Sequence, residues 1–198
     1  VSHMGYVVMG IASMTPQGMV GAIFQMFNHG TITAMLFMIV GVIYDRSHTR
    51  GLDDFGGLAT KMPVYTGIMM VAFFAALGLP TLSGFVSEVL VFLGTFQTYP
   101  VIAIIAATGI ILGASYMLWA LQKVFFGKLP ERWQGPWDPT RKKYKTDDLN
   151  FVEICSLAPL AAIIIFFGLN PNPMINIMAA SANHLIEVVK IAYPMAGM

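Results

Sequence analysis

The stretch Gly78-Leu79-Pro80-Thr81-Leu82-Ser83-Gly84 interrupts an apolar segment that runs from residue 63 to residue 97. As one straight α-helix this segment would be about 52 Å long, well beyond a bilayer core of about 30 Å. Pro80 removes a backbone donor, and the flanking glycines tolerate non-helical dihedral angles. We therefore predict a helix over 63–97 that is broken at 78–84. Backbone at such a break must be shielded from lipid by protein or by a polar cavity.

Four further apolar stretches surround this segment, over residues 1–14, 18–44, 100–121 and 151–169. The composition agrees, because 57% of the residues are hydrophobic and only 11% are charged, against about 25% charged in a soluble domain. We exclude a soluble globular protein and predict an all-α polytopic transmembrane helix bundle over 1–169. The single cysteine, Cys155, leaves no disulfide within the chain and too few ligands for a zinc site.

Basic residues decide how the broken segment crosses the membrane. Of eleven Lys and Arg residues, three lie in the loop 45–62 and seven in the loop 122–150. By the positive-inside rule both loops face the cytoplasm, which requires an even number of crossings between them. Segment 100–121 is one crossing, so 63–97 is the other. A re-entrant hairpin or a double span at 63–97 is therefore excluded.

The start of the sequence and its last twenty-five residues lead to two separate predictions. The chain opens at Val1 without a charged region before its first apolar stretch, so we expect no signal peptide and read the sequence as the C-terminal part of a longer protein. Residues 174–193 mix apolar positions with His184, Glu187 and Lys190, which predicts an amphipathic helix at the outer face. A sixth, marginal span is the alternative.

Titratable side chains inside the membrane are the candidate functional residues. Among ten acidic residues we place only Glu88 within a membrane stretch, where burying a carboxylate costs about 3 kcal/mol. Counted at 1.5 Å per residue from the outer ends of their helices, Glu88 lies at a depth of about 13 Å and His3 and His29 at about 16 Å. Three titratable groups at one level predict a lateral proton relay.

Structural explanations compete with the relay. Glu88 could pair with a basic group on a helix outside this sequence, and each histidine could be a neutral residue that donates to a neighbouring helix. Lys123, about 34 Å from the outer start of its span, either takes part in proton entry or is a topology-setting lysine that snorkels. The sequence has no phosphate-binding glycine loop and no metal-ligand spacing, so we expect no cofactor in this chain.

Five short motifs, taken together, resemble the sequence pattern of a known family. They are Ser2-His3-Met4-Gly5, Asn28-His29-Gly30 followed by Leu36-Phe37, Tyr44-Asp45-Arg46-Ser47-His48-Thr49-Arg50, Gly56-Gly57-Leu58, and Gly78-Leu79-Pro80 leading to Gly84-Phe85-Val86-Ser87-Glu88. Together they resemble the antiporter-like subunits of respiratory complex I. The resemblance runs from Val1 to about Gly168 and weakens over 129–150.

In that family a subunit has fourteen transmembrane helices in two inverted five-helix repeats, each with one broken helix. The resemblance implies that this chain holds the last five helices and that Glu88 ends the central hydrophilic axis. It implies that His3 and His29 lie along this axis, and that Lys123 matches a usually basic site near the inner face. The terminal amphipathic helix would clasp neighbouring subunits.

Two residues depart from the family pattern. Thr81 and Ser87 stand at positions where many members have glycine. We expect both departures to change only the local freedom of the backbone.

The resemblance implies a proton-translocating membrane subunit of NADH-quinone oxidoreductase, a translocase that couples quinone reduction to proton pumping, in a bacterial inner membrane. NADH, FMN, iron–sulfur clusters and quinone would bind elsewhere in the complex. Its partners would be other membrane subunits, including neighbouring antiporter-like subunits, and the bilayer, but no nucleic acid. The alternatives are a homologous subunit of a multisubunit Na+/H+ antiporter or membrane-bound hydrogenase, a non-catalytic scaffold, and a substrate transporter that uses the break.

Overall fold

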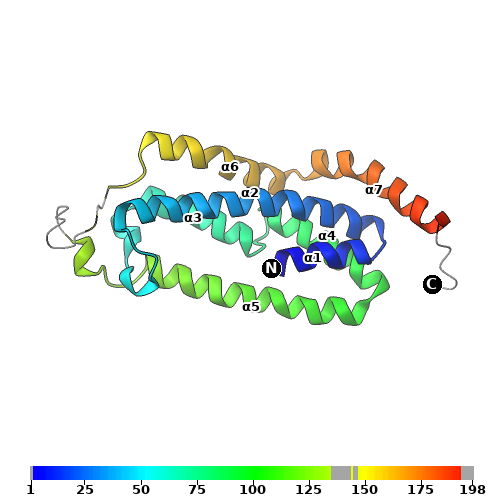
Figure 1. Ribbon diagram of the computed structural model, residues 1–198, viewed down its shortest axis with the longest axis horizontal. Helices are drawn as coiled ribbons and strands as arrows, with labels where there is room; N and C mark the ends of the chain where they lie inside the picture. Colours follow the sequence, from blue (N-terminus) through cyan, green and yellow to red (C-terminus); the bar gives the residue numbers. More distant parts are fainter. Residues whose placement is uncertain (1, 135–143, 145–146, 193–198) are drawn as a thin grey trace. The chain divides into compact units, whose positions relative to one another are not determined.

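Helices make up all the regular structure in the part of the chain that the computed structural model describes, namely residues 2–134, 144 and 147–192 (Figure 1). This confirms the predicted all-α class. The α-helices are α1 (Ser2–Ala12), α2 (Pro16–Ser47), α3 (Pro63–Ala76), α4 (Ser83–Thr98), α5 (Pro100–Phe125), α6 (Phe151–Leu169) and α7 (Asn172–Ala192), and the short 3-10 helices are η1 (Leu52–Asp54), η2 (Leu58–Thr60) and η3 (Glu131–Trp133).

The helices belong to two compact units. Unit 1 consists of Val1–Thr31, Gly78–Ile111 and Ile164–Met198, and unit 2 consists of Ile32–Leu77 and Leu112–Ile163. Helices α2, α5 and α6 contribute residues to both units.

Three helices in the described ranges are long and apolar enough to cross a membrane, namely α2, α5 and α6. Helix α3 is a shorter apolar helix, and α7 is not among the candidate spans. The segment 63–97 contains two helices, as predicted, but α3 ends at Ala76 and α4 begins at Ser83. The predicted break at 78–84 was therefore wrong at its end, because Leu82 is extended and Ser83 and Gly84 already form the first turn of α4.

The break contains two residues in the left-handed region, Gly78 with φ 70° and Thr81 with φ 84°. Glycine adopts this conformation at no steric cost, whereas a β-branched residue is strained there. The family's frequent glycine at position 81 fits this backbone better than threonine does, so the departure at Thr81 adds strain rather than only changing freedom.

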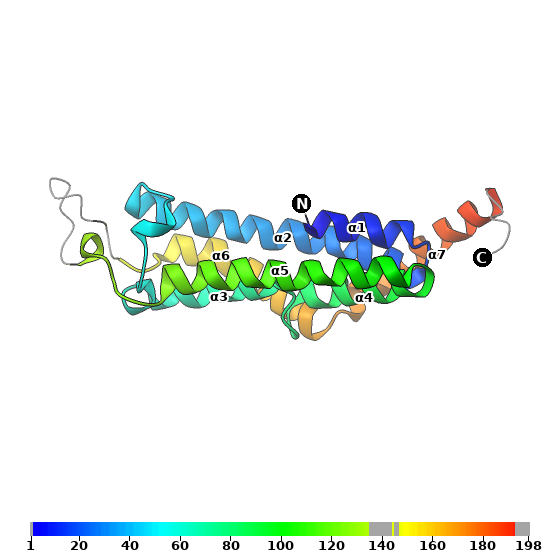
Figure 2. The same cartoon turned by 90° about the horizontal axis from the view of Figure 1, so that it is seen from below.

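Close helix contacts hold the break and its neighbours within unit 1. Helix α1 packs against α4 (Figure 1; Figure 2). A Cβ atom at Gly21 of α2 would lie 2.7 Å from the Val91 amide nitrogen of α4, and one at Gly168 of α6 would collide with the backbone of Thr81 and Leu82. Small residues that let backbones approach in this way are typical of membrane helix packing. The end of α6 thus covers the backbone of the break.

Helix α7 packs on unit 1 through one face. Its residues Ala182 and Ile186 are buried against Met19 and Val20 of α2, whereas Ile177 and Ile191 are largely exposed. The predicted amphipathic character of 174–193 agrees with this one-sided burial, although the helix begins two residues earlier, at Asn172.

In unit 2 the two lysine- and arginine-rich loops lie side by side. The Gly57 amide donates to the Phe126 carbonyl at 3.2 Å, and the buried indole of Trp133 donates to the Asp54 carbonyl at 3.0 Å. Both views show the segment after α2 beside the segment after α5 (Figure 1; Figure 2). The loops therefore share one end of unit 2, as the charge pattern requires.

Candidate functional site

Three titratable side chains from three helices meet in unit 1. His3 of α1 lies with its Nε2 3.9 Å from Oε1 of Glu88 on α4, and its ring centroid is 5.9 Å from that of His29 on α2. Glu88 is 6% exposed and both histidines are half-buried. The spacing from His3 to Glu88 exceeds a direct hydrogen bond. The structure thus brings His3 close to each of the other two residues predicted from their depth in the membrane.

Gly78 forms part of the wall around the Glu88 carboxylate. A Cβ atom at Gly78 would collide with Oε2 of Glu88, and the positive φ of Gly78 independently favours glycine. The broken backbone therefore lies directly against the buried acid. The backbone conformation favours glycine here, and a larger residue would also displace the Glu88 carboxylate.

A buried network of amide and hydroxyl groups adjoins Glu88, and its residues are not among the site residues predicted from the sequence. The Nδ2 of Asn28 donates to the Ser87 hydroxyl at 2.8 Å and to the Ser83 carbonyl at 2.9 Å, and the Ser87 hydroxyl donates to Oε1 of Gln25. All of these residues are 2% exposed or less. The network joins α2 to the first turns of α4, the helix that carries Glu88.

This network corrects the expectation for Ser87. A glycine at this position could neither accept from Asn28 nor donate to Gln25, so Ser87 does more than change backbone freedom. The sequence offered one signal, because Gln25 and Asn28 are polar residues three apart in an apolar stretch and therefore share a helix face. Their partner on another helix could not be read from spacing.

Lys123 belongs to unit 2 and lies in an exposed ion pair. Its Nζ is 2.5 Å from Oδ1 of Asp53 and 5.1 Å from the ring centroid of Trp119. The Asp53 side chain is 94% exposed, and the hydrogen bond from Lys123 lowers the pKa of the Asp53 carboxyl below its usual value. This is the geometry of a lysine that reaches past an aromatic ring toward water.

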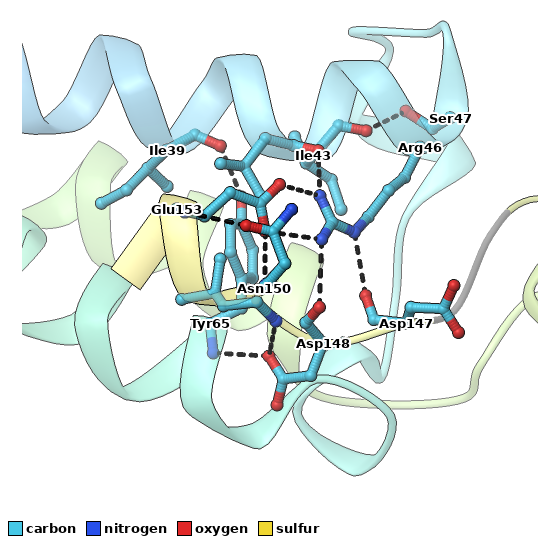
Figure 3. Close-up of polar contacts among 11 residues, drawn as sticks. Ile39, Ile43, Arg46, Ser47, Tyr65, Asp147, Asp148, Asn150 and Glu153 are labelled. Carbon is cyan, nitrogen blue, oxygen red and sulfur yellow. Dashed lines mark hydrogen bonds and ion pairs between the residues drawn. The ribbon is translucent and has the colours of Figure 1, made fainter. Parts of the chain in front are cut away.

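A second buried charged cluster, in unit 2, is centred on Arg46 (Figure 3). The guanidinium donates two parallel hydrogen bonds of 2.8 Å to the Glu153 carboxylate. It also donates to the backbone carbonyls of Val42, Asp147 and Asp148 at 2.8 to 3.0 Å. A buried Arg–carboxylate pair with every donor direction used is a strong and specific contact. It ties the end of α2 to the start of α6.

The acidic side chains of this cluster also cap helices. Asn150 and Glu153 form a reciprocal capping box at the start of α6, each side chain accepting from the other's amide. The Asp148 carboxylate accepts from the amides of Val64 and Tyr65 in the first turn of α3. Three helix ends in unit 2 are thus held by one short segment.

This cluster corrects two sequence readings. The charge pattern predicts Arg46 as a loop residue that sets topology, yet it is the last basic residue of α2 and buried. The sequence analysis places only Glu88 within a membrane stretch, but Glu153 lies in the first turn of α6, a candidate span. The Asn-x-x-Glu capping pattern was readable from the sequence, whereas the Arg46 partnership required the fold.

Metal binding has no support in the described ranges, since residues 2–134, 144 and 147–192 contain no group of three or more His, Cys, Asp or Glu side chains that could hold a metal ion.

Known proteins similar to this chain fall into one family. Residues 1–113 match the family model described as the transmembrane part of NADH:quinone oxidoreductase and Mrp antiporters. NADH-quinone oxidoreductase subunit M of Rickettsia typhi is 44% identical over 186 residues, which cover 94% of this chain and 36% of that protein. F(420)H(2) dehydrogenase subunit M of Methanosarcina mazei is 40% identical, with 94% of this chain and 36% of that protein covered.

The fold comparison agrees. A chain of respiratory complex I from Thermus thermophilus with bound NADH superposes with a TM-score of 0.78 and 29% identity, covering 93% of this chain and 37% of that chain. The five motifs resemble those of chain M, also called chain 4. The relatives that carry these two names confirm that resemblance. The chain spans a little over a third of the length of the curated relatives it matches.

Proposed function

Because the chain belongs to the NADH:quinone oxidoreductase/Mrp antiporter transmembrane family, we propose that it is part of a proton-translocating membrane subunit of NADH-quinone oxidoreductase. In this proposal protons pass between His29, His3 and Glu88 while quinone is reduced elsewhere in the complex. One observation carries it, namely that three titratable side chains from α1, α2 and α4 meet around a buried carboxylate.

The geometry supports transfer in short steps. A protonated His3 releases its Nε2 proton toward the Glu88 carboxylate 3.9 Å away, and then regains a proton from the side of His29. These separations are too long for direct donation, so a water or a side-chain rotation completes each step. Two buried oxygens near the path, Asn28 Oδ1 and Ser83 Oγ, have no hydrogen-bond partner among the described residues and are of the kind that ordered water satisfies.

The remaining assignments follow the same proposal. Lys123, paired with Asp53, lies on the side where protons enter, and the loops 45–62 and 122–150 face the cytoplasm of a bacterial cell. Helix α7 lies at the outer face and contacts neighbouring antiporter-like subunits. NADH, FMN, iron–sulfur clusters and quinone are held by other parts of the complex.

The decisive experiment replaces Glu88 by glutamine in the full-length protein within its membrane complex. Loss of the relay acid lowers the rate of proton transfer through this subunit by on the order of a hundredfold, the lower range for general acid–base groups. Glu187→Gln, at an exposed glutamate of α7, is the matched control and leaves pumping unchanged. Full pumping by the Glu88 variant would instead support a scaffold role.

A second candidate function comes from the same family description, which includes Mrp antiporters. The relative from Methanosarcina mazei is named for a different electron donor. We infer that the motifs alone do not choose between a quinone reductase and an antiporter or hydrogenase complex. Peripheral redox subunits that co-purify with the protein, and the response of transport to Na+, distinguish these candidates.

A further inference from the structure

An open groove of about 570 Å³ lies in unit 2 at the end of α5. Its lining includes Trp119, Gln122 and Lys123 from the last turns of α5, together with Phe55, Phe126 and Lys128. The groove thus combines an amide, two cations and three aromatic rings at a helix end. The proton relay proposed above uses none of its residues except Lys123.

The charged side chains of this groove are both cationic. Lys123 is engaged by Asp53 at 2.5 Å, which leaves little of its charge for a ligand. Lys128 is exposed and makes no ion pair with any residue in 2–134, 144 or 147–192. The net positive charge and the Gln122 amide suit an anion that accepts several hydrogen bonds, as a phosphate group does.

An apolar stripe on α5 leads into the groove. Leu112, Tyr116 and Trp119 are spaced i, i+4 and i+7 and therefore lie on one helix face. Their side chains are 67%, 60% and 54% exposed. The stripe is about 10 Å long, and Lys123 lies about one helical turn beyond its end at Trp119. A soluble phosphate would leave this surface uncovered.

We propose that the groove binds an anionic phospholipid, with its phosphate between Lys128 and Gln122 and an acyl chain along Leu112 and Tyr116. Interfacial tryptophan and a lysine that extends past it are typical of the headgroup level of a membrane. Basic pockets at the cytoplasmic ends of transmembrane helices recognise anionic headgroups in the same way. This site is separate from the Glu88 cluster and gives the chain a lipid specificity that the proposed relay does not require.

The test places a photo-crosslinking amino acid at Gln122 of the full-length protein in its membrane complex, in vesicles of equal phosphatidylglycerol and phosphatidylcholine. Phosphatidylglycerol is captured in about fivefold excess, the factor for about 1 kcal/mol from one lysine near an anionic surface. Lys128→Gln removes this preference. Lys61→Gln makes the same charge change in the loop 45–62 outside the groove and retains it.

A second crosslinker position, Leu118 on α5, lies outside the groove and captures both lipids equally. Equal capture of the two lipids at Gln122, or a preference that Lys128→Gln does not reduce, overturns the proposal. Capture of a polypeptide at Gln122 would identify a protein interface instead. If excess inorganic phosphate abolishes the preference, the groove is a soluble anion site and the lipid assignment is wrong.

Discussion

Glu88 is buried, at 6% exposed, and the Glu153 side chain is partly buried, at 18% exposed, and their surroundings differ. Glu153 receives two parallel hydrogen bonds of 2.8 Å from the Arg46 guanidinium and caps α6. Glu88 has a histidine at 3.9 Å, a glycine against its oxygens and an amide network beside it. A carboxylate held by a permanent cation contributes to stability, whereas Glu88 is the acid of the proposed proton relay.

The largest expected effect comes from breaking the fixed pair. Arg46→Met removes five hydrogen bonds and leaves the Glu153 carboxylate without its cation, so the variant loses about 3 to 5 kcal/mol of stability. Thermal unfolding of the detergent-purified complex measures this loss. Arg50→Met, which removes only a cation–π contact of 4.7 Å with Tyr44, costs less than about 1 kcal/mol.

The double variant Arg46→Met/Glu153→Leu tests whether the unpaired Glu153 charge causes this loss of stability. Because it leaves no unpaired charge, it recovers part of the stability lost in the single variant. A double variant less stable than Arg46→Met alone would show that the segment 147–150 depends on Glu153 contacts other than the ion pair.

The same substitution, glutamate to glutamine, made at each acid in turn compares what the two carboxylates contribute to stability. Glu153→Gln replaces a bidentate acceptor by an amide and costs about 2 kcal/mol, in the range for hydrogen bonds to charged groups. Glu88→Gln has no such partner to lose, so the free energy of unfolding changes by less than about 1 kcal/mol. Chemical or thermal unfolding of the two variants measures the difference. Equal destabilisation would contradict the distinction drawn between the two acids.

The smallest expected effect concerns the exposed pair of Asp53 and Lys123. Lys123 lowers the pKa of the Asp53 carboxyl in the folded protein, so this pair stabilises the protein above the unfolded-state pKa of about 3.9. That stabilisation is lost as the pH falls through the lowered folded pKa. Melting temperatures of the wild type and Asp53→Asn therefore differ slightly at neutral pH and converge in acid. The difference is small because solvent screens an exposed pair.

Local chemistry made part of the site predictable. Pro80 between glycines marked the break, and counting residues along each helix selected His3, His29 and Glu88 as a group. The same counting could not show that His3 lies 3.9 Å from Glu88, because that separation depends on how α1 and α4 pack. It also missed Ser87, whose role depends on Gln25 and Asn28 of another helix.

Charge counting identified the two basic loops but not the partner of Arg46. The pattern of basic loops required 45–62 and 122–150 to share one end, and in unit 2 they contact each other. Counting treats every basic residue alike, however, and so it missed that Arg46 is buried against Glu153. Whether a charge faces water or another charge depends on contacts between residues more than a hundred positions apart.

The sequence by itself determined the helical class, the apolar stretches, the approximate position of the break and the identity of the titratable residues, because hydropathy, proline and glycine act locally. Only the tertiary structure decided which charges are paired. It placed Gly78 against Glu88, Arg46 against Glu153 and Lys123 beside Asp53. The same carboxylate chemistry yields an ion pair with arginine at Glu153 and a buried acid near a histidine at Glu88, since each depends on the partners that packing brings within reach.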